Sequence, residues 1–434
     1  MALPANIFRA YDIRGVYGKD LTPEIAALIG GALSNFEKGE YCLCHDTRFS
    51  SPILSRALAG GLAGAGSKVL DAGFGPIGMA IYASKHLALH VAYVTASHLP
   101  PQWNGIKLFR PGGNPICLGD IEKIREIAEK GVSWSGIETY GEIIVRELLP
   151  EYSEFLHGIG KHSGGLRVVV DCGNGSTAMV VPELLRDLGY EVYTVNCDVD
   201  PRFPARGSEP TPENTGYMLP VIKAFKADVG VSFDGDGDRV IFFDEKGEPL
   251  TPEQAAVVMI RALGRVDVAA NVECSSIVDK EVAKRGGKVV RVPVGRIFMI
   301  LDAMRAGVEL GVESSGHFVA YKGINLDDGI VSLLFMLETL EKLDSPLSSL
   351  RVPMPPSKKI KLDVPDEKKF AVVDLLKARY LKEYDRVTTL DGVRVDTDKG
   401  WVLVRASNTE PVIRVTIEAE DNEWLSKLEE KVIS

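Results

Sequence analysis

Three segments of the chain share one order of hydrophobic and polar positions. Each has a short apolar run, a polar turn, a stretch with helical spacing and a second apolar run. The three segments begin with YCLCHDTR (41–48), RVVVDCGNGS (167–176) and VDVAANVECS (266–275). This order predicts a strand, a helix of about three turns and another strand, which is the β-α-β unit of a parallel sheet covered by helices. We therefore predict three related α/β domains.

A second pattern follows each unit: an apolar strand, a compact polar motif and another apolar strand. The motifs are TASHLPPQWNGIK (95–107), DGDGDR (234–239) and ESSGH (313–317). Because each motif directly follows an apolar run, we expect it at the carboxyl end of a strand, where open α/β sheets bind ligands. Three such loops can surround a single cleft.

The pattern changes near residue 350, where PLSSLRVPMPPSKKIKLD indicates a linker into a new element. We predict strands at KIKLDV, GVRVDTDKGWVLVRAS and VIRVTIEAE, and helices near 367–380 and 422–432. These elements form a small α+β domain that is large enough to fold alone. The predicted domains are 1–150, 151–250, 251–350 and 351–434.

The overall charge restricts the possible partners. The 434 residues are 45% hydrophobic and 25% charged, typical of a globular protein with several domains, and the net charge is −10. Nucleic acid or an anionic membrane surface is therefore not expected as the main partner. If the ligand is an anion, the protein must build a local positive site.

Cysteine usage and the N-terminus indicate a cytoplasmic protein. The six cysteines lack the paired spacing of a zinc site, so we expect free thiols in a reducing compartment. The N-terminus has no basic region followed by a long apolar stretch, as a secretory signal would. No apolar run approaches the ~20 residues of a membrane span.

The DGDGDR motif is the most specific signal. Asp234, Asp236 and Asp238 can converge on one hard cation, and the glycines between them permit the necessary curvature. An EF-hand-like calcium loop is an alternative, because Glu245 falls at its twelfth position. However, its sixth position is Arg239 instead of glycine, and its flanks have the pattern of strands. We predict a catalytic divalent-metal site; the remaining alternative is a solvated acidic turn.

Ser97 lies in a stretch without acidic residues, since residues 72–119 contain no Asp or Glu in this acidic chain. A serine after a strand is most often a turn residue or a helix cap. Here the local positive charge suits a phosphoserine or a phosphorylated substrate. We predict Ser97 as a phosphate carrier. The basic residues and the histidine that we expect to supply this field are Lys85, His98, Lys107 and Arg110.

The ESSGH motif supplies groups that suit a sugar. Glu313 and Ser315 can hold two neighbouring hydroxyls, and His317 can act as an acid or a base. The alternative is a polar hairpin turn in which the histidine is satisfied by hydrogen bonds. Arg9 and Arg14, in FRAYDIRG, can add positive charge, although the sequence does not place them in the cleft.

The RASNTEP segment (405–411) is a candidate phosphate pocket. A guanidinium, two hydroxyls, an amide and backbone N–H groups match the needs of a phosphate dianion. The alternative is an ordinary Asx turn between strands. The candidate ligands are Arg405, Ser407, Asn408, Thr409 and Arg414.

Together and in this order, FRAYDIRG, TASH…NGIK, DGDGDR, ESSGH and RASNTEP resemble the α-D-phosphohexomutase superfamily, most closely its phosphomannomutase/phosphoglucomutase branch. The resemblance runs the length of the chain. It implies a heart-shaped fold around a central cleft, with three α/β domains of mixed sheets and a TATA-binding-protein-like α+β fourth domain. It also implies an isomerase of carbohydrate metabolism that interconverts hexose 1-phosphate and hexose 6-phosphate of mannose and/or glucose. The implied path uses a phosphoserine and a bound hexose 1,6-bisphosphate, which also serves as activator.

The resemblance implies a role for each matching residue. Ser97 is the phosphoserine, and an oxygen of its phosphate joins three aspartates in holding Mg²⁺. The implied metal ligands are Ser97, Asp234, Asp236 and Asp238. The implied electrostatic and proton-transfer residues are Arg14, His98, Lys107, Arg239 and His317. The residues implied to bind the sugar hydroxyls and the phosphate that is not transferred are Glu313, Ser315, Arg405, Ser407, Asn408, Thr409 and Arg414.

One departure concerns Leu99, which stands where the family commonly has asparagine in TASHNP. It puts the rigidity of the Ser97 loop in doubt more than the reaction. A phosphoglucosamine mutase is the alternative activity, followed by a metal-dependent sugar phosphatase and a non-catalytic sugar-phosphate sensor. The expected partners are hexose phosphates. The sequence ranks neither mannose, glucose and glucosamine phosphates nor monomer and homo-oligomer.

Overall fold

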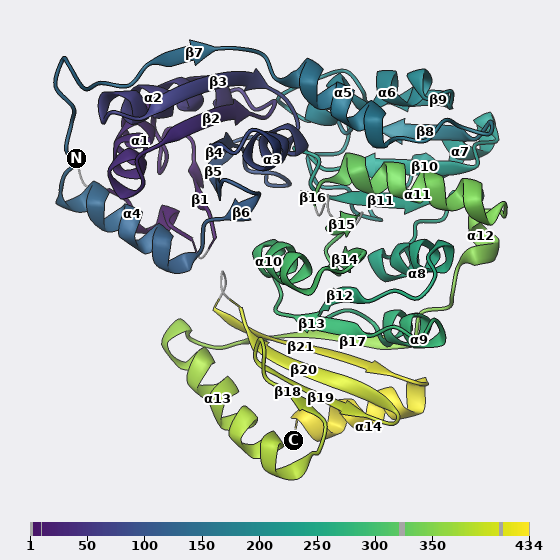
Figure 1. Ribbon diagram of the computed structural model, residues 1–434. Coiled ribbons are helices and arrows are strands. Elements are labelled where there is room, and N and C mark those ends of the chain that lie inside the picture. The colour runs from purple at the N-terminus through teal and green to yellow at the C-terminus, as the bar shows by residue number, and fades with distance from the viewer. Residues whose placement is uncertain (1–2, 10, 321–325, 408–410, 434) are drawn as a thin grey trace. The chain divides into compact units, whose positions relative to one another are not determined.

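The computed structural model divides the chain into two compact units (Figure 1). Unit 1 comprises Met1–Thr251 and Gly316–Leu350, and unit 2 comprises Pro252–Ser315 and Arg351–Ser434. The residues that the structure describes are 3–9, 11–320, 326–407 and 411–433. Within these ranges, no helix combines the length and the hydrophobicity needed to cross a membrane.

The first sheet of unit 1 has the order β1-β5-β4-β2-β3-β7, and β6 pairs with β5. Strands β4, β2, β3 and β7 run parallel, whereas β5 and β1 are antiparallel to their neighbours. The first predicted β-α-β unit is β2-α2-β3. The strands are β1 (Ile13–Val16), β2 (Glu40–His45), β3 (Lys68–Phe74), β4 (His90–Val94), β5 (Trp103–Arg110), β6 (Asn114–Pro115) and β7 (Ile143–Val145). The helices are η1 (Ala5–Ile7), α1 (Pro23–Phe36), α2 (Ser51–Gly64), α3 (Ile77–His86), α4 (Leu118–Lys130) and α5 (Leu149–Ile159).

Helices α1 and α2 pack closely because glycines face each other where they cross. A Cβ atom on Gly30 would lie 2.3 Å from the carbonyl oxygen of Leu58, and one on Gly61 would lie 1.9 Å from that of Ala27. Any side chain at these positions would push the helices apart and open the core beneath them. Residues of this core include Ile25, Leu33, Leu43, Leu58, Leu62 and Ile106.

The second sheet of unit 1 has the order β11-β10-β8-β9, in which only β11 is antiparallel. Its strands are β8 (Arg167–Asp171), β9 (Glu191–Val195), β10 (Val229–Phe233) and β11 (Val240–Phe243). The helical segments are η2 (Ser176–Met179), α6 (Val181–Asp187) and α7 (Met218–Phe225). The second segment of unit 1 contains β15 (Phe318–Ala320) and β16 (Leu326–Asp327), which are not part of this sheet, and the helices α11 (Gly329–Leu343) and α12 (Leu347–Leu350).

Unit 2 repeats the same strand arrangement. Strand β12 lies between β13 and β14 and is parallel to both, as β8 lies between β9 and β10 and β2 lies between β3 and β4. Its elements are α8 (Pro252–Ala262), β12 (Val268–Asn271), α9 (Ser276–Lys284), β13 (Val289–Val292), α10 (Arg296–Ala306) and β14 (Leu310–Val312). The three predicted β-α-β units are therefore present.

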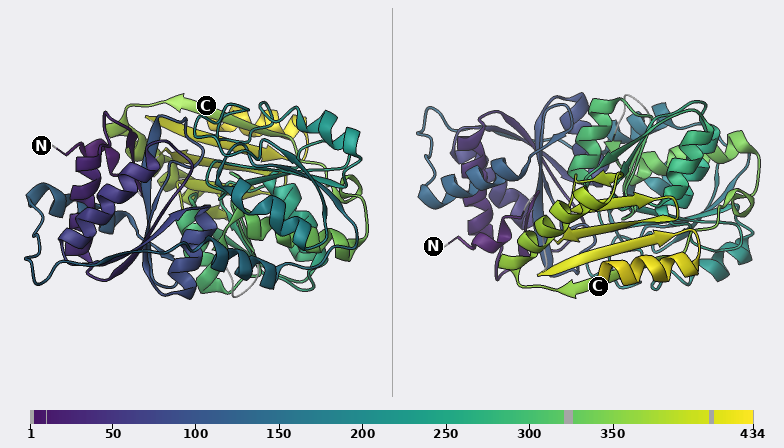
Figure 2. Two further views of the ribbon diagram at one scale, coloured as in Figure 1. Left: turned by 90° about the horizontal axis from the view of Figure 1, so that it is seen from above. Right: turned by 90° about the horizontal axis from the view of Figure 1, so that it is seen from below.

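The C-terminal part of unit 2 is an antiparallel sheet of order β17-β21-β20-β19-β18. Side chains of α13 and α14 join one core with the sheet, and both helices lie on the same face of it (Figure 2). One predicted strand is in fact a hairpin, because GVRVDTDKGWVLVRAS forms β19 and β20. The elements are β17 (Ser357–Asp363), α13 (Asp366–Glu383), β18 (Val387–Thr388), β19 (Val393–Thr397), β20 (Gly400–Ala406), β21 (Val412–Ala419) and α14 (Asn422–Ile433).

Candidate active site

Ser97 lies in the loop that follows β4. Its side chain is buried, and its Oγ donates to Oδ2 of Asp234 at 2.6 Å, across 137 positions of sequence. Oδ1 of Asp238 is 3.2 Å from the same oxygen. The backbone of Ser97 has a φ of +51°, in the left-handed region that non-glycine residues seldom adopt. The structure thus brings the serine motif and the aspartate motif together inside unit 1.

The turn between β10 and β11 directs three carboxylates inward. Gly237 has a φ of +83°, which favours glycine at this position. The backbone N–H groups of Gly237 and Arg239 donate to Oδ1 of Asp234 at 2.9 and 3.2 Å. Asp234, Asp236 and Asp238 are buried, and one oxygen from each lies within 4.8 Å of the others.

The electrostatics of this cluster fit a divalent cation. Burial, followed by the charges of Asp238 and Asp236, raises the pKa of Asp234 well above its ordinary value. Oδ1 of Asp236 is buried and has no hydrogen-bond partner among the described residues. Carboxylate oxygens are preferred ligands of Mg²⁺. The calcium-loop alternative finds no support, because the flanks are strands and Glu245 instead accepts the N–H of Ser348 at 3.0 Å.

Two cations face the carboxylates from neighbouring strands. Lys107 on β5 is buried, with its Nζ 2.8 Å from Oδ2 of Asp236 and 2.6 Å from Oδ2 of Asp238. Arg14 lies on β1 and donates to Asp12 at 2.6 Å. Burial alone would lower the pKa of Arg14, but Asp12 raises it, with further contributions from Asp238 and Asp236. Arg14 therefore lies within electrostatic reach of the cluster.

Arg239 and His317 form a second polar group at the cluster. Nη1 of Arg239 is 3.1 Å from Oε1 of Glu209, and its Nε donates to Nε2 of His317 at 3.2 Å. Nδ1 of His317 lies 3.0 Å from Oδ1 of Asp327. Burial alone would lower the pKa of His317, but the charges of Asp327 and then Asp238 raise it. The hydrogen bond from Arg239 requires an unprotonated Nε2, so the observed arrangement holds a neutral ring with its proton directed at Asp327.

His98 adjoins the serine but is a weak base in this environment. Its Nδ1 lies 3.4 Å from Oγ of Ser97. Burial, followed by the charges of Arg239 and Arg14, lowers the pKa of His98 to about 2. The ring is therefore neutral near neutral pH.

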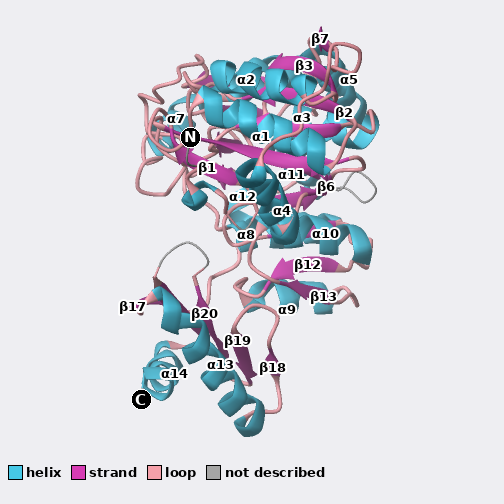
Figure 3. Ribbon diagram, turned by 90° about the vertical axis from the view of Figure 1, so that its left-hand side faces the viewer, coloured by secondary structure: helices cyan, strands magenta, loops and turns pink. Residues whose placement is uncertain are grey.

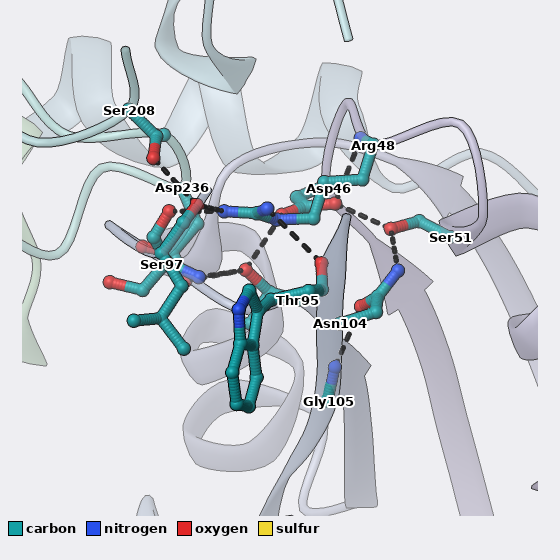
Figure 4. A network of polar contacts seen from close by, with 12 residues as sticks. Asp46, Arg48, Ser51, Thr95, Ser97, Asn104, Gly105, Ser208 and Asp236 are labelled. Carbon is teal, nitrogen blue, oxygen red and sulfur yellow. Dashed lines mark hydrogen bonds and ion pairs between the residues drawn. The ribbon is translucent and has the colours of Figure 1, made fainter. Parts of the chain in front are cut away.

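The loop of Ser97 is held by residues that the sequence analysis did not assign to the site (Figure 4). Arg48 is fully buried, and its Nη2 donates to the carbonyl oxygens of Ser97 and Leu99, both at 2.7 Å. Its Nη1 donates to the carbonyl oxygens of Pro100 at 2.7 Å and Trp103 at 3.1 Å. One guanidinium thus fixes four carbonyl groups of the loop.

Hydroxyl groups complete this network (Figure 4). Oγ1 of Thr95 accepts the N–H of Ser97 at 2.8 Å and lies 2.9 Å from Oδ2 of Asp236. Oγ of Ser208 is 2.7 Å from the carbonyl oxygens of both His98 and Leu99. The sequence signal for Arg48 is its position, because the segment after β2 lies at the same edge of the sheet as the Ser97 loop.

The structure does not bring all the predicted cations to Ser97. Arg110 forms ion pairs with Glu37 at 2.7 Å and Asp120 at 2.8 Å, at the far end of β5. Lys85 lies near the end of α3. The expectation that Arg110 contributes to a positive field around Ser97 is therefore wrong, because nearby carboxylates neutralise its charge.

The predicted sugar and phosphate ligands belong to unit 2. Glu313 is buried and follows β14, whereas Ser315 is exposed. Ser407 is buried, and its N–H donates to the carbonyl oxygen of Val412 at 3.0 Å. Asn408 and Thr409 lie outside the described residues.

Three basic side chains form a row on the C-terminal sheet. Arg405 on β20 is directly opposite Arg414 on β21, which is in turn opposite Lys361 on β17. Nη1 of Arg405 is 3.4 Å from Oδ2 of Asp391. Like charges directly opposite each other destabilise a sheet, so a bound anion would be favourable here. The row shares its face with Leu403, which packs against the first part of unit 2.

Comparisons with known proteins give consistent matches along the chain. Models of the phosphoglucomutase/phosphomannomutase alpha/beta/alpha domains I, II and III match residues 5–133, 150–247 and 251–356. The model of the C-terminal domain of the same family matches residues 360–434.

Individual relatives and structures agree with these matches. A probable phosphoglucosamine mutase of Methanopyrus kandleri is 35% identical, with 98% of this chain and 96% of the relative covered. A phosphomannomutase/phosphoglucomutase of Pseudomonas aeruginosa is 36% identical, with 98% and 94% covered. The crystal structure of a phosphoglucomutase/phosphomannomutase family protein of Burkholderia thailandensis superposes with a TM-score of 0.89 at 30% identity, covering 98% of this chain and 95% of that chain.

Proposed function

The chain belongs to the phosphoglucomutase/phosphomannomutase family and is a phosphohexomutase, and we propose that it interconverts hexose 1-phosphate and hexose 6-phosphate of mannose and/or glucose through a phosphoserine at Ser97. Membership confirms the predicted fold class, α/β domains followed by a C-terminal α+β domain, and the predicted isomerase class. The observation that carries the proposal is the 2.6 Å contact between Oγ of Ser97 and Asp234.

In the proposed reaction, the bond between phosphorus and Oγ of Ser97 breaks as a free hydroxyl of the hexose monophosphate bonds to phosphorus. The hydroxyl loses its proton to a base of the site, and a hexose 1,6-bisphosphate results. The intermediate then reorients in the site, and Oγ of Ser97 bonds to the phosphorus of its other phosphate as the bond from that phosphorus to the sugar oxygen breaks. The base returns its proton to this oxygen, and the isomeric monophosphate leaves. The product therefore differs from the substrate only in the position of its phosphate.

The surrounding residues serve binding and charge. Asp234, Asp236 and Asp238 would hold Mg²⁺, which when bound would offset the charge of the transferring phosphoryl group. Lys107 and Arg239 contribute positive charge near Ser97, since both act electrostatically on the adjacent His98, and charge stabilisation dominates phosphoryl transfer.

His317 is the more suitable proton acceptor of the two histidines in unit 1 that border the cluster. Asp327 at Nδ1 orients its ring and favours its protonated form, whereas the low pKa of His98 disfavours proton storage there. Arg239 would have to release Nε2 of His317 during the proton transfer.

The residues of unit 2 would bind the rest of the substrate. Glu313 and Ser315 supply a carboxylate and a hydroxyl for the sugar hydroxyls. The row formed by Arg405 and Arg414 suits the phosphate that is not being transferred, because two guanidinium groups face one anion. The intermediate must reorient between the two phosphoryl transfers, so this pocket must accept either phosphate of the bisphosphate.

Replacement of Ser97 tests the proposal directly. We expect Ser97→Ala to lower kcat by at least about 10³-fold, because removal of a covalent carrier has effects of this size or larger. Incubation with hexose 1,6-bisphosphate should add one phosphate to the intact mass of the wild type and none to the variant. Ser426→Ala, at an exposed position of α14, is the matched control. Wild-type turnover by Ser97→Ala would refute the assignment.

A second activity, on glucosamine phosphate, is supported by the Methanopyrus relative, which matches at 35% identity compared with 36% for the Pseudomonas enzyme. A coupled assay with mannose, glucose and glucosamine phosphates, with and without the corresponding bisphosphate, decides between them. Stoichiometric release of inorganic phosphate would instead indicate a phosphatase. Binding without turnover of any of the three sugars would indicate a sensor.

A further inference from the structure

Strand β7 is the last strand of the first sheet and pairs only with β3 among the described strands. Figure 3 shows it at the outer border of unit 1, beyond β3. Exposed sheet edges are usually protected by charged residues, proline or a covering segment, because they pair readily with other strands. The three residues of β7 are Ile143, Ile144 and Val145.

Hydrogen bonds to β3 show which backbone groups of this edge are directed outward. The carbonyl oxygen of Glu142 accepts the N–H of Val69, and the N–H of Arg146 donates to Asp71. Because successive residues of a strand face opposite neighbours, residues 142, 144 and 146 face β3. The N–H and C=O groups of Ile143 and Val145 consequently point away from the sheet.

The side chains of this edge are also exposed to an unusual extent. The exposed fractions are 45% for Ile143, 49% for Ile144 and 76% for Val145. Ile137 and Tyr140, in the segment that leads into β7, are 88% and 66% exposed. A strand with apolar residues on both faces and an unpaired edge is suited to join another strand.

We propose that a second copy of this chain pairs its β7 antiparallel to this β7, with the two-fold axis at Ile144. In this register, Ile143 and the partner's Val145 exchange both backbone hydrogen bonds, as do Val145 and the partner's Ile143. Ile144 lies opposite the partner's Ile144. The sheets of the two subunits would then form one continuous sheet.

Charge complementarity selects this partner and this register. The sequence Glu142-Ile143-Ile144-Val145-Arg146 carries an acid, three apolar residues and a base, so antiparallel pairing about Ile144 places each Glu142 opposite the partner's Arg146. Both residues are exposed, although Arg146 also contacts Glu151 of its own chain. If the axis lay at Val145, Ile143 would face the partner's Glu147. If the axis lay at Ile143, Glu142 would face the partner's Ile144. Of these three registers, only the proposed one pairs Glu142 with an arginine and each apolar residue of β7 with another apolar residue.

A hollow beside the edge can receive the partner's side chains. Ile143 lines an open hollow of about 800 Å³, whose other lining residues include Tyr140, Glu138 and Glu142 of the same segment and Gly60, Ala63 and Gly64 of α2. The partner's Val145, directly opposite Ile143, projects from the same face of the sheet. Pairing would therefore place an apolar side chain over this hollow.

Cysteine cross-linking tests the register. Residues 144 of the two subunits form a non-hydrogen-bonded pair with Cα atoms about 4.5 Å apart, which permits a disulfide. We expect Ile144→Cys to form a covalent dimer under mild oxidation. Val145→Cys is the matched control, because position 145 lies diagonal to its own copy at about 7–8 Å or more, too far for a disulfide. Equal cross-linking of both variants, or cross-linking of neither, would overturn the register.

Charge reversal tests the interface in solution. Light scattering on the full chain should give a dimer for the wild type and a monomer for Glu142→Arg, in which arginines face each other. Glu142→Arg combined with Arg146→Glu should restore the dimer. A wild-type monomer at every concentration, or a dimer indifferent to Glu142→Arg, would overturn the proposal. These measurements use no substrate, so they stand or fall independently of the role of Ser97.

Discussion

At the scale of single residues, the conformation of Ser97 depends on side chains that do not react. A non-glycine residue in the left-handed region is strained and persists only where its surroundings hold it. Arg48, 49 positions earlier, donates to the carbonyl oxygen of Ser97, and Ser208 donates to the next carbonyl groups. These hydrogen bonds to the carbonyl groups of the loop therefore hold Oγ of Ser97 in its direction toward Asp234.

We expect Arg48→Lys to lower kcat by about 10–100-fold, because one ammonium group cannot reach four carbonyl oxygens and small displacements of reacting groups have costs of this size. KM for the sugar phosphate should change little, since the hydrogen bonds of Arg48 go to the Ser97 loop and to Asp46, neither of which is proposed to bind the sugar. Ser208→Ala, which removes a hydroxyl that contacts the same loop, should have a smaller effect in the same direction. Steady-state kinetics with both variants measures this. A rise in KM with constant kcat would contradict a positioning role.

Asp236 offers a test of the metal site that needs no turnover. In EDTA, Asp236→Asn should be at least as stable as the wild type, because one buried charge leaves a cluster whose members repel each other. Mg²⁺ at a hundredfold excess over Kd should stabilise the wild type by about 2.7 kcal/mol and the variant far less. Thermal unfolding with EDTA and with Mg²⁺ measures both. Asp187→Asn, on the surface, should keep the full Mg²⁺ effect, and an equal effect in Asp236→Asn would argue against this site.

The sequence predicts part of this arrangement, for a physical reason. Ser97 and Asp234 each follow an apolar strand, and the carboxyl ends of parallel strands are where loops converge. Arg48 carries no comparable signal, because its partners are carbonyl oxygens, which every residue has. Counting charges along the chain also misleads, since Arg110 lies in the acid-free stretch yet pairs with Glu37 from another segment.

At the scale of elements, helix α11 depends on a buried cap. Oδ1 of Asp328 accepts the N–H groups of Ile330 at 2.8 Å and Val331 at 3.4 Å, while its Oδ2 accepts the hydroxyl of Tyr152 from α5 at 2.5 Å. Burial raises the pKa of Asp328 to about 6. One carboxyl group therefore joins two helices that are far apart in sequence.

The raised pKa of Asp328 makes its contribution to stability depend on pH. The folded state binds the proton of Asp328 more tightly than the unfolded state does, so its contribution to stability grows as pH falls through about 6 and is complete below about 4. As the pH falls from about 7 to about 5, the free energy of unfolding of the wild type should rise by about 1 kcal/mol relative to that of Asp328→Asn. This variant keeps a capping oxygen without a titrating proton. Denaturant unfolding of both proteins at the two pH values measures this difference. A constant difference would show that Asp328 does not titrate in this range.

Asp328→Ala should be less stable than Asp328→Asn by about 2–4 kcal/mol, because it loses the cap and leaves the hydroxyl of Tyr152 buried without this partner. The sequence pattern does not reveal α11, since most of its residues are buried and no polar face appears until its last turns. The β19-β20 hairpin is hidden for another reason. Its turn at Asp398 and Lys399 is short, so two alternating runs read as one strand.

At the scale of the whole molecule, the candidate groups are divided between the two units. Ser97 and the aspartate cluster belong to unit 1, whereas Glu313 and Arg405 belong to unit 2. The ESSGH motif itself is divided, because Ser315 ends one segment and His317 lies in the next. The order of motifs in the sequence predicts the groups that the reaction needs, but the division depends on packing between distant segments, which no local pattern contains.

The row of cations on the C-terminal sheet gives the last prediction. We expect Arg405→Ala to raise KM for the hexose phosphate by about 10–100-fold, from the loss of a charge-assisted hydrogen bond of about 1.5–3 kcal/mol. Inorganic phosphate should raise the unfolding temperature of the wild type more than that of the variant, because the anion relieves the repulsion between Arg405 and Arg414. Arg379→Ala, exposed on α13, is the matched control and should leave both values unchanged. An unaltered KM in Arg405→Ala would remove this arginine from the phosphate site, while phosphorylation of Ser97 would remain a separate question, since its acid cluster lies in the other unit.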